Sequence, residues 1–235
     1  MSDLLVIIPV LGRPQNANQV ATSIDNNTAT PCRIAFVCTH GDDDQIAACR
    51  QTIEPRRDLV YVLEPNSVGD YAKKINHAYR MGDERYVFLG ADDLVFHQGW
   101  DVEAIRVMHE TGAGVVGTND LANQQTIAGL HSTHSLVDRA YIDRCGGYVG
   151  GPGRVYFEGY HHQFVDNELV QTAMARDCYA HAFHSQVKHL HPLWRTAPDD
   201  ATYRLALRDS GPDRLLFESR KCLWEDEARA VAAES

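Results

Sequence analysis

The stretch YVFLGADDLVF, residues 86–96, places the first constraint on the fold. A run of strand-forming apolar residues ends in two adjacent carboxylates, Asp92 and Asp93, and the apolar pattern then resumes. Neighbouring anions repel each other, and burying an unpaired charge is costly. The pair therefore needs water, a basic partner or a bound cation at the end of a buried strand.

Three earlier apolar runs precede this one, and helical patterns separate them. The predicted strands are LLVIIPV (4–10), RIAFVC (33–38), DLVYVL (58–63) and ERYVFLG (84–90). Helices are predicted after a polar stretch at 13–18 to about residue 26, from 42–44 to about 53, and over 68–82, where Gly82 is the stop signal. This alternation predicts right-handed βαβ units and a mostly parallel, Rossmann-like α/β sheet flanked by helices.

Polar residues follow these strands at the places where ligands bind in such sheets. Ligand sites lie beyond the carboxyl ends of the strands. The polar clusters found there are Gly12-Arg13-Pro14, Thr39-His40-Gly41-Asp42 and Asp92-Asp93. Their convergence at one sheet edge is the first indication of a functional site.

The composition limits the classes of protein to which the chain can belong. The chain has 235 residues, 44% hydrophobic and 23% charged residues, and a net charge of −10. These values are typical of a globular protein, and the negative charge argues against broad electrostatic capture of nucleic acid. Six scattered cysteines without a CxxC pair predict reduced thiols. Neither a membrane-spanning run nor a signal peptide is visible, so a cytoplasmic location is expected.

The second half of the chain shows a different sequence pattern, with a glycine-dense segment between its predicted helices and strands. A helix is predicted over 100–111, a strand at 114–117, a helix over 164–177, a strand at 178–183 and a further segment at 186–194. The glycine-dense GGYVGGPG, residues 146–153, predicts a mobile loop that closes as a lid. The expected organisation is one fused domain over 1–197, with halves 1–95 and 96–197, and a helical C-terminal extension over 198–235.

Asp92 and Asp93 admit two interpretations from the residues alone. Both could lie in a solvated turn, with Asp93 capping the next helix. Alternatively they hold a divalent cation, because Mg²⁺ and similar ions take one or two carboxylates together with substrate phosphates and water. Such a cation would stabilise charge on a departing diphosphate.

The segments VIIPVLGRP, KKINHAYR and FLGADD together resemble the nucleotide-sugar-binding half of GT-A glycosyltransferases, with the family 2 group as the nearest likeness. The resemblance covers roughly residues 4–195. It implies a GT-A fold with a small acceptor-side sheet, and an acidic motif after the fourth strand that holds Mn²⁺ or Mg²⁺ and the diphosphate. The usual first acidic position is Gly90 here, which leaves metal binding to Asp92 and Asp93.

The same resemblance implies a general base in the stretch FVDNEL, residues 164–169. The acidic pair of the family matches this place, with Val165 where Glu is common, so the base is assigned to Asp166 and Glu168 is the second candidate. Residues at i and i+2 of a helix face different directions, so these two acids do not form a matched pair. A helix N-terminal acid stabilised by the dipole is the alternative interpretation.

His189 and His191 are candidate metal ligands. On a strand their spacing places both imidazoles on one face. The resemblance implies a late histidine ligand at this position, whereas two ordinary histidines near a reversal at Pro192 are the alternative.

Nucleotide contacts are assigned by the resemblance and by position after the strands. The candidates are Pro9, Arg13, Thr39, Asp42, Lys73 (or Lys74), Asn76 and Asp92. Helix capping by Asp42 and a solvated helix face around Lys73 remain open. Trp100 and Trp194 are considered for stacking on a sugar ring.

The resulting hypothesis is a metal-dependent glycosyltransferase that moves a sugar from a UDP- or GDP-linked donor to an acceptor hydroxyl. The resemblance implies inversion by one displacement. The alternatives are a non-catalytic nucleotide-sugar- or carbohydrate-binding module, a sugar nucleotidyltransferase and a histidine-rich zinc hydrolase. The compact chain resembles bacterial and phage enzymes. The acceptors considered are a glycan, a protein and a modified base in DNA. A homodimer is also considered.

Overall fold

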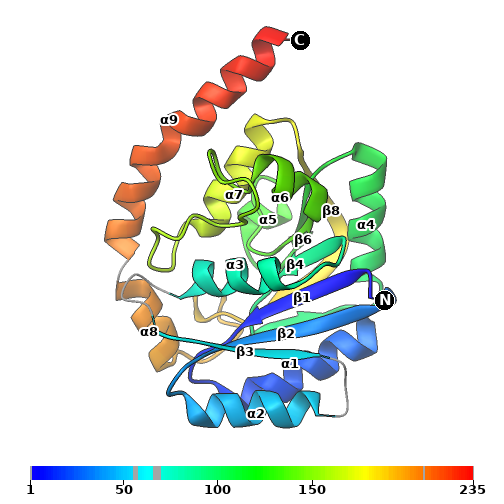
Figure 1. Cartoon of the computed structure of the whole chain (residues 1–235), viewed down its shortest axis with the longest axis vertical. Coiled ribbons are helices and arrows are strands. Elements are labelled where there is room, and N and C mark those ends of the chain that lie inside the picture. Colours follow the sequence, from blue (N-terminus) through cyan, green and yellow to red (C-terminus); the bar gives the residue numbers. More distant parts are fainter. Residues whose placement is uncertain (1, 55–57, 66–69, 209, 235) are drawn as a thin grey trace.

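The computed structural model describes residues 2–54, 58–65, 70–208 and 210–234. Within them, eight strands form one sheet in the order β3-β2-β1-β4-β7-β6-β8-β5, flanked by helices (Figure 1). The pairs β3-β2, β2-β1, β1-β4 and β6-β8 are parallel, whereas β4-β7, β7-β6 and β8-β5 are antiparallel. The predicted α/β class with a mostly parallel sheet is confirmed.

The first half follows the predicted alternation closely. Its strands are β1 (Leu4–Pro9), β2 (Cys32–Thr39), β3 (Leu59–Leu63) and β4 (Tyr86–Leu89), and its helices are α1 (Pro14–Asn27), α2 (Asp43–Ile53) and α3 (Tyr71–Met81). The predicted start of the third helix, 68–69, lies outside the described residues. Continuous apolar runs form these strands because helices cover the sheet on both faces.

The central strand β1 shows how the two faces are built. Leu4, Val6 and Ile8 pack into one core with α1, α2 and α4 (Trp100–Thr111), while Leu5 and Ile7 pack into a second core. Successive side chains of a strand point to opposite faces, so a run without polar residues serves both cores. The second core contains α3, α6 (Arg139–Cys145) and α7 (Val165–Ala175).

The second half departs from prediction in several elements, among them the helix α6, which was not predicted. The strand β7 (Ser135–Asp138) lies between β4 and β6 (Val115–Asn119), in a region for which no strand was predicted. The two segments predicted at 178–183 and 186–194 form one strand, β8 (Tyr179–His189), which also pairs with β5 (Leu94–Phe96). The short helix α5 (Gln124–Ile127) and a 3₁₀ turn over Pro192–Trp194 complete this half.

The glycine-dense segment 146–153 is a packed loop. Gly147 N–H donates to the Arg154 carbonyl at 2.8 Å, and a Cβ at Gly147 would lie 2.0 Å from the Val155 carbonyl oxygen. Close packing therefore explains Gly146, Gly147 and Gly151, whereas Gly150 and Gly153 have open space around them and positive φ values that favour glycine. None of these residues lines the cleft described below, so the structure does not support the expected lid at this segment.

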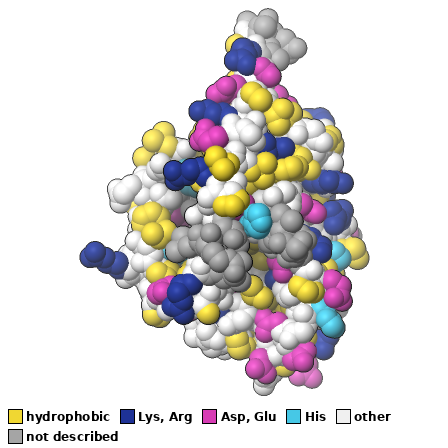
Figure 2. All heavy atoms as spheres, turned by 90° about the vertical axis from the view of Figure 1, so that its left-hand side faces the viewer, with side chains coloured by type: hydrophobic (Ala, Val, Ile, Leu, Met, Phe, Trp, Pro, Cys, Tyr) yellow, Lys and Arg dark blue, Asp and Glu magenta, His cyan; other side chains and the backbone are white. Residues whose placement is uncertain are grey.

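Two helices follow the sheet, α8 (Ala201–Arg208) and α9 (Ser210–Glu234). The far end of α9 extends beyond the body (Figure 1), and its surface mixes charges of both signs with apolar side chains (Figure 2). None of the helices in the described part of the chain is long and apolar enough to cross a membrane.

Candidate functional site

A cleft of about 530 Å³ opens at the carboxyl ends of β1 and β4. It brings together predicted site residues that are far apart in the sequence, namely Pro9, Arg13, Asp92, Asp93, Asp166, His189 and His191. Its location matches the rule that ligands bind beyond strand ends in α/β sheets.

Gly90 and Ala91 carry the chain from β4 to the carboxylate pair. A Cβ at Gly90 would lie 2.7 Å from Ile8 Cδ1 and 3.0 Å from the Ile7 carbonyl oxygen. The approach of β1 therefore leaves no room for an acidic side chain at this position. Asp92 and Asp93 follow it and are only 8% and 9% exposed.

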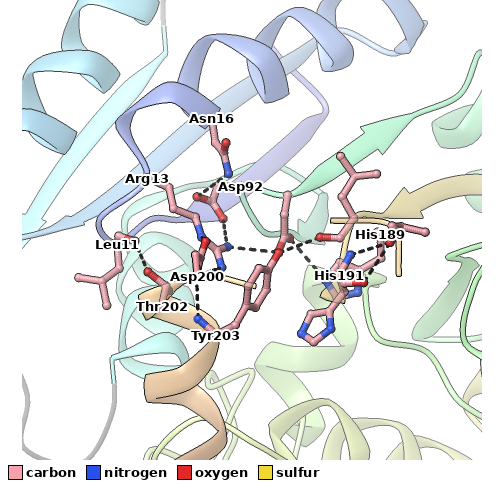
Figure 3. Close-up of polar contacts among 12 residues, drawn as sticks. Leu11, Arg13, Asn16, Asp92, His189, His191, Asp200, Thr202 and Tyr203 are labelled. Atoms are coloured by element: carbon pink, nitrogen blue, oxygen red, sulfur yellow. Dashed lines mark hydrogen bonds and ion pairs between the residues drawn. The ribbon is translucent and has the colours of Figure 1, made fainter. Parts of the chain in front are cut away.

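Arg13 lies against both carboxylates (Figure 3). Its Nη1 donates to Asp92 Oδ1 at 3.2 Å and to Asp93 Oδ2 at 3.3 Å. Asn16, in the first turn of α1, donates a further hydrogen bond to Asp92 Oδ2 at 3.3 Å. Of the three partners expected for the acidic pair, which were water, a basic residue or a cation, the structure shows a basic residue from the loop after β1.

The helix α8 closes this cluster from the C-terminal side. Asp200 accepts from Arg13 Nε at 2.8 Å and from Nη2 at 3.2 Å, and the Tyr203 ring lies 3.8 Å from the guanidinium carbon. The Tyr203 hydroxyl donates to Asp93 Oδ2 at 2.8 Å, and Thr202 donates to the Leu11 carbonyl at 3.2 Å. Sequence reasoning missed Asp200 and Tyr203, because the predicted tail carried no local motif.

The two carboxylates differ in their tendency to ionise. Burial, with the Asp93 charge beside it, raises the pKa of Asp92 to about 7, although Arg13 opposes the shift. Burial also disfavours the Asp93 anion, but the His189 imidazole and the Tyr203 hydroxyl outweigh it and hold the pKa of Asp93 below its ordinary value. The negative charge of the pair therefore resides mainly on Asp93 near neutral pH.

Three histidines, His134, His189 and His191, lie together beside Asp93. His189 Nε2 faces Asp93 Oδ1 at 3.5 Å, and its ring centroid lies 5.0 Å from that of His134 and 5.1 Å from that of His191. His191 Nδ1 accepts from the Leu193 backbone N–H at 3.2 Å, which fixes its ring at the start of the 3₁₀ turn. Both predicted histidines thus reach the cleft, but only His189 lies on β8, whereas His191 follows the end of the strand, so alternation along a strand does not explain the position of His191.

The chemistry of this donor set suits a hard divalent cation, since it offers carboxylate oxygens and imidazole nitrogens. Two buried nitrogens here, His134 Nε2 and His189 Nδ1, have no hydrogen-bond partner within the described residues, and Asp93 Oδ1 has only the ion-pair contact with His189 Nε2 at 3.5 Å. Unmet polar capacity of this kind is costly and marks a place for a ligand. No three His, Cys, Asp or Glu side chains of the described part are grouped as a ready metal site, and Arg13 bridges the carboxylates instead.

Asp166 also lines the cleft, in the first turn of α7. Its Oδ2 lies 3.3 Å from His131 Nε2, and its Oδ1 accepts from the Asn167 N–H at 2.9 Å. Burial disfavours the Asp166 anion, but the imidazole of His131 outweighs it and lowers the pKa of Asp166. The carboxylate is therefore ionised and held in one orientation. His131 is a further residue that sequence reasoning missed.

Glu168 points away from the cleft. It accepts from Tyr160 Oη at 2.7 Å and from Arg220 Nε and Nη2 at 2.9 and 2.7 Å. The side chains of residues i and i+2 of a helix point about 200° apart around its axis. Asp166 therefore faces the cleft, whereas Glu168 faces α9. Glu168 anchors α7 to α9 and has no access to a cleft ligand.

The remaining residues that were predicted to contact the nucleotide fall into two groups, those that line the cleft and those that do not. Pro9 and Arg13 line the cleft, and so does Lys74, whose Nζ donates to the Val10 carbonyl at 2.8 Å. Lys73 points outward to the Glu64 carbonyl. The neighbouring residue is thus the one that faces the cleft, because consecutive helical residues differ by about 100° in direction.

Thr39, Asp42 and Asn76 do not line the cleft. Thr39 donates to Asp70, and Asp42 accepts from the Gly12 N–H at 2.8 Å, so both hold the loops around the cleft. Asn76 is fully buried, donates to the Tyr156 carbonyl at 2.7 Å and accepts from its N–H at 3.0 Å. It is a structural link, and the structure leaves it no contact with a nucleotide.

The two tryptophans considered for stacking on a sugar ring lie in different environments. Trp100 is fully buried between Phe88 and Phe96 and belongs to the core. Trp194 lines the cleft and is 37% exposed. Only Trp194 is available to a ligand.

Comparisons with known proteins identify the fold. No protein-family model matches the sequence, and no curated protein sequence matches it. The mannosyltransferase PcManGT from Pyrobaculum calidifontis, solved with GDP-Man and Mn²⁺, is similar in structure, with a TM-score of 0.62, 14% identity, and coverage of 100% of this chain and 76% of that one.

Two further structures agree. Glucosyl-3-phosphoglycerate synthase from Mycobacterium tuberculosis, solved with Mn²⁺, UDP-Glc and glycerol 3-phosphate, has a TM-score of 0.63 at 12% identity, over 93% of this chain and 80% of that one. S. aureus TarS has a TM-score of 0.58 at 15% identity, over 77% of this chain and 58% of that one. These likenesses confirm the predicted fold: the chain has the GT-A fold of these glycosyltransferases.

Proposed function

We propose that this protein is a glycosyltransferase that moves a sugar from a UDP- or GDP-linked donor to an acceptor hydroxyl. The observation that carries the proposal is the cleft itself, which is lined both by an acidic cluster at the end of β4 and by an ionised, oriented Asp166 from α7. Such a pair of edges suits a group transfer, with a charged leaving group on one side and an acceptor on the other.

The donor edge of the cleft, which we define as Arg13, Asp92, Asp93, Asp200 and Tyr203, is proposed to receive the diphosphate. Asp92, Asp93 and His189 would hold Mn²⁺ or Mg²⁺, with His191 as an alternative ligand, and such an ion supplies charge neutralisation to a departing diphosphate when bound. Lys74 supports the assignment, because its ammonium lines the same cleft, and Pro9 would contact the nucleotide.

The acceptor edge, which we define as His131, Gln163, Asp166, Asn167 and Trp194, is proposed to position the acceptor. Asp166 would take the proton of the attacking hydroxyl, since an ionised carboxylate within hydrogen-bond reach is a competent base. A single base on the side opposite the leaving group supports inversion by one displacement. His131 is proposed to orient the Asp166 carboxylate.

The acceptor edge carries few charges. Asp166 is acidic, and among the described cleft residues from position 117 onward there is no Lys or Arg. Amide, imidazole and indole groups favour a hydroxyl on an uncharged glycan or protein over a modified base in DNA, whose phosphates call for cationic contacts. A homodimer and a cytoplasmic location in a bacterium, including one infected by a phage that encodes the protein, remain predictions.

The proposal is tested by incubating the protein with Mn²⁺ and a panel of UDP- and GDP-sugars, with and without neutral glycan and peptide acceptors. We expect release of UDP or GDP from one donor, abolished in Asp92→Ala and retained in Asp44→Ala, an exposed acid on α2. Nucleotide binding without any turnover would favour the binding module. Release of pyrophosphate from a nucleoside triphosphate would favour a nucleotidyltransferase.

A further inference from the structure

The first turn of α8 and the residues before it cover the carboxylate pair of the donor edge. Three side chains make the contacts: Asp200 to Arg13, Thr202 to the Leu11 carbonyl, and Tyr203 to Asp93 and to the Leu190 carbonyl, the last at 2.8 Å (Figure 3). Together they leave the Arg13 side chain 7% exposed. We call residues 198–208 the α8 segment.

We propose that the α8 segment is an autoinhibitory lid, which holds Arg13 in the place of the divalent cation and opens to admit cation and donor. The inference rests on the proposed function. It adds a second role for Arg13, which on release from the carboxylates turns from their counterion into a ligand of the donor diphosphate.

The two occupants of the carboxylate pair exclude each other. Arg13 Nη1 is 3.2 Å from Asp92 Oδ1 and 3.3 Å from Asp93 Oδ2, so one nitrogen bridges the two side chains. A divalent cation lies about 2.0–2.6 Å from its carboxylate oxygens and brings further ligands with it. The bridging guanidinium must therefore leave before a cation can use the same oxygens.

The contacts that retain Arg13 are suited to opening. Asp200 holds the guanidinium through two hydrogen bonds, yet its own side chain is 39% exposed, so water competes for the pair. Tyr203 stacks on the guanidinium and binds Asp93, so its movement uncovers both partners at once. All three anchors, Asp200, Thr202 and Tyr203, belong to the α8 segment, and a single displacement of this segment releases them together.

The released Arg13 has a defined use. A guanidinium presents a planar fork of donors that matches phosphate oxygens, and it keeps its charge at every working pH. A cation that takes over Asp92 and Asp93 would leave this fork beside the space where a diphosphate is expected. The lid therefore couples cation binding to the appearance of a phosphate ligand.

The first test measures Mn²⁺ binding by calorimetry without any donor, in the full chain. Asp200→Asn removes the charged anchor at nearly constant size, and we expect Mn²⁺ to bind several-fold more tightly than to the unaltered protein. Asp199→Asn is the matched control, because Asp199 pairs with the exposed Arg204 and not with Arg13. Unchanged or weaker Mn²⁺ binding in Asp200→Asn overturns the lid, as does the absence of Mn²⁺ binding in both variants.

The second test separates the two roles of Arg13. In Arg13→Gln we expect tighter Mn²⁺ binding and at least tenfold weaker binding of UDP or GDP in the presence of Mn²⁺. A residue that only supports the fold would weaken both, and that result overturns the switch. Both tests measure binding, so a protein that passes them but transfers no sugar would refute the proposed function and leave the lid intact.

Discussion

The donor edge and the acceptor edge of the cleft are built on different principles. At the donor edge, Arg13 is surrounded by three carboxylates, and the whole cluster is held by a segment from the C-terminal part of the chain. At the acceptor edge, Asp166 is fixed by one imidazole and by its own helix. If the proposed function holds, the donor edge has to rearrange to admit a cation, whereas the Asp166 carboxylate of the acceptor edge is already oriented.

The largest expected effect tests whether the acceptor edge carries the chemistry. Asp166→Asn should lower the transfer rate about 10²–10⁴-fold, the usual contribution of a general base. Binding of Mn²⁺ and of the nucleotide should stay unchanged, because the ion pair and the hydrogen bond of the Asp166 carboxylate are with His131 and Asn167 and not with a donor-edge residue. A loss of nucleotide binding in this variant, measured by calorimetry, would break the division between the two edges.

The donor edge should respond in the complementary way. Asp93→Asn should lower transfer about 10²–10³-fold, as loss of charge stabilisation at a leaving group does. Here Mn²⁺ binding should fall as well, which single-turnover kinetics and calorimetry on the same sample can measure. Full activity in this variant without added metal would show that the pair has no part in the reaction.

Glu168→Gln tests whether the organisation of the acceptor edge depends on α9. Removing the negative charge leaves Arg220 partly buried without its carboxylate partner, a change that costs about 3–5 kcal/mol in buried pairs. Urea denaturation should therefore show a large loss of stability, with nucleotide binding retained. Glu225→Gln, in an exposed pair with Lys221, is the control and should cost less than about 1 kcal/mol.

The smallest expected effect is on the pH dependence of stability. Burial disfavours the charged His131, but Asp166 outweighs it and raises the pKa of His131 above 6.5. The stabilisation from this pair is therefore fully present below pH 6.5 and is lost as the pH rises through the raised value. The stability difference between the protein and His131→Gln should shrink over that range, and a difference independent of pH would contradict the pairing.

The parts of the fold that follow from local pattern were predictable. Apolar runs with intervening helical periodicity define β1 to β4, and the twin acids after 89 mark a strand end because no buried strand accommodates them. The short strand β7 was not predicted, since its four residues lie in a polar region and form a strand only between β4 and β6. A strand that depends on its neighbours leaves little trace in its own sequence.

The sequence by itself determined which chemical groups exist and where along each element they fall: carboxylates after β4, a carboxylate at the start of α7, and two imidazoles at the end of β8. Only the tertiary structure decided which of them meet. It turned Lys74 rather than Lys73 toward the cleft, gave Glu168 to Arg220, and brought Asp200 to Arg13 across 187 residues of chain. The physical reason is that periodicity fixes the direction of a side chain relative to its own element, whereas its partners depend on how distant elements pack.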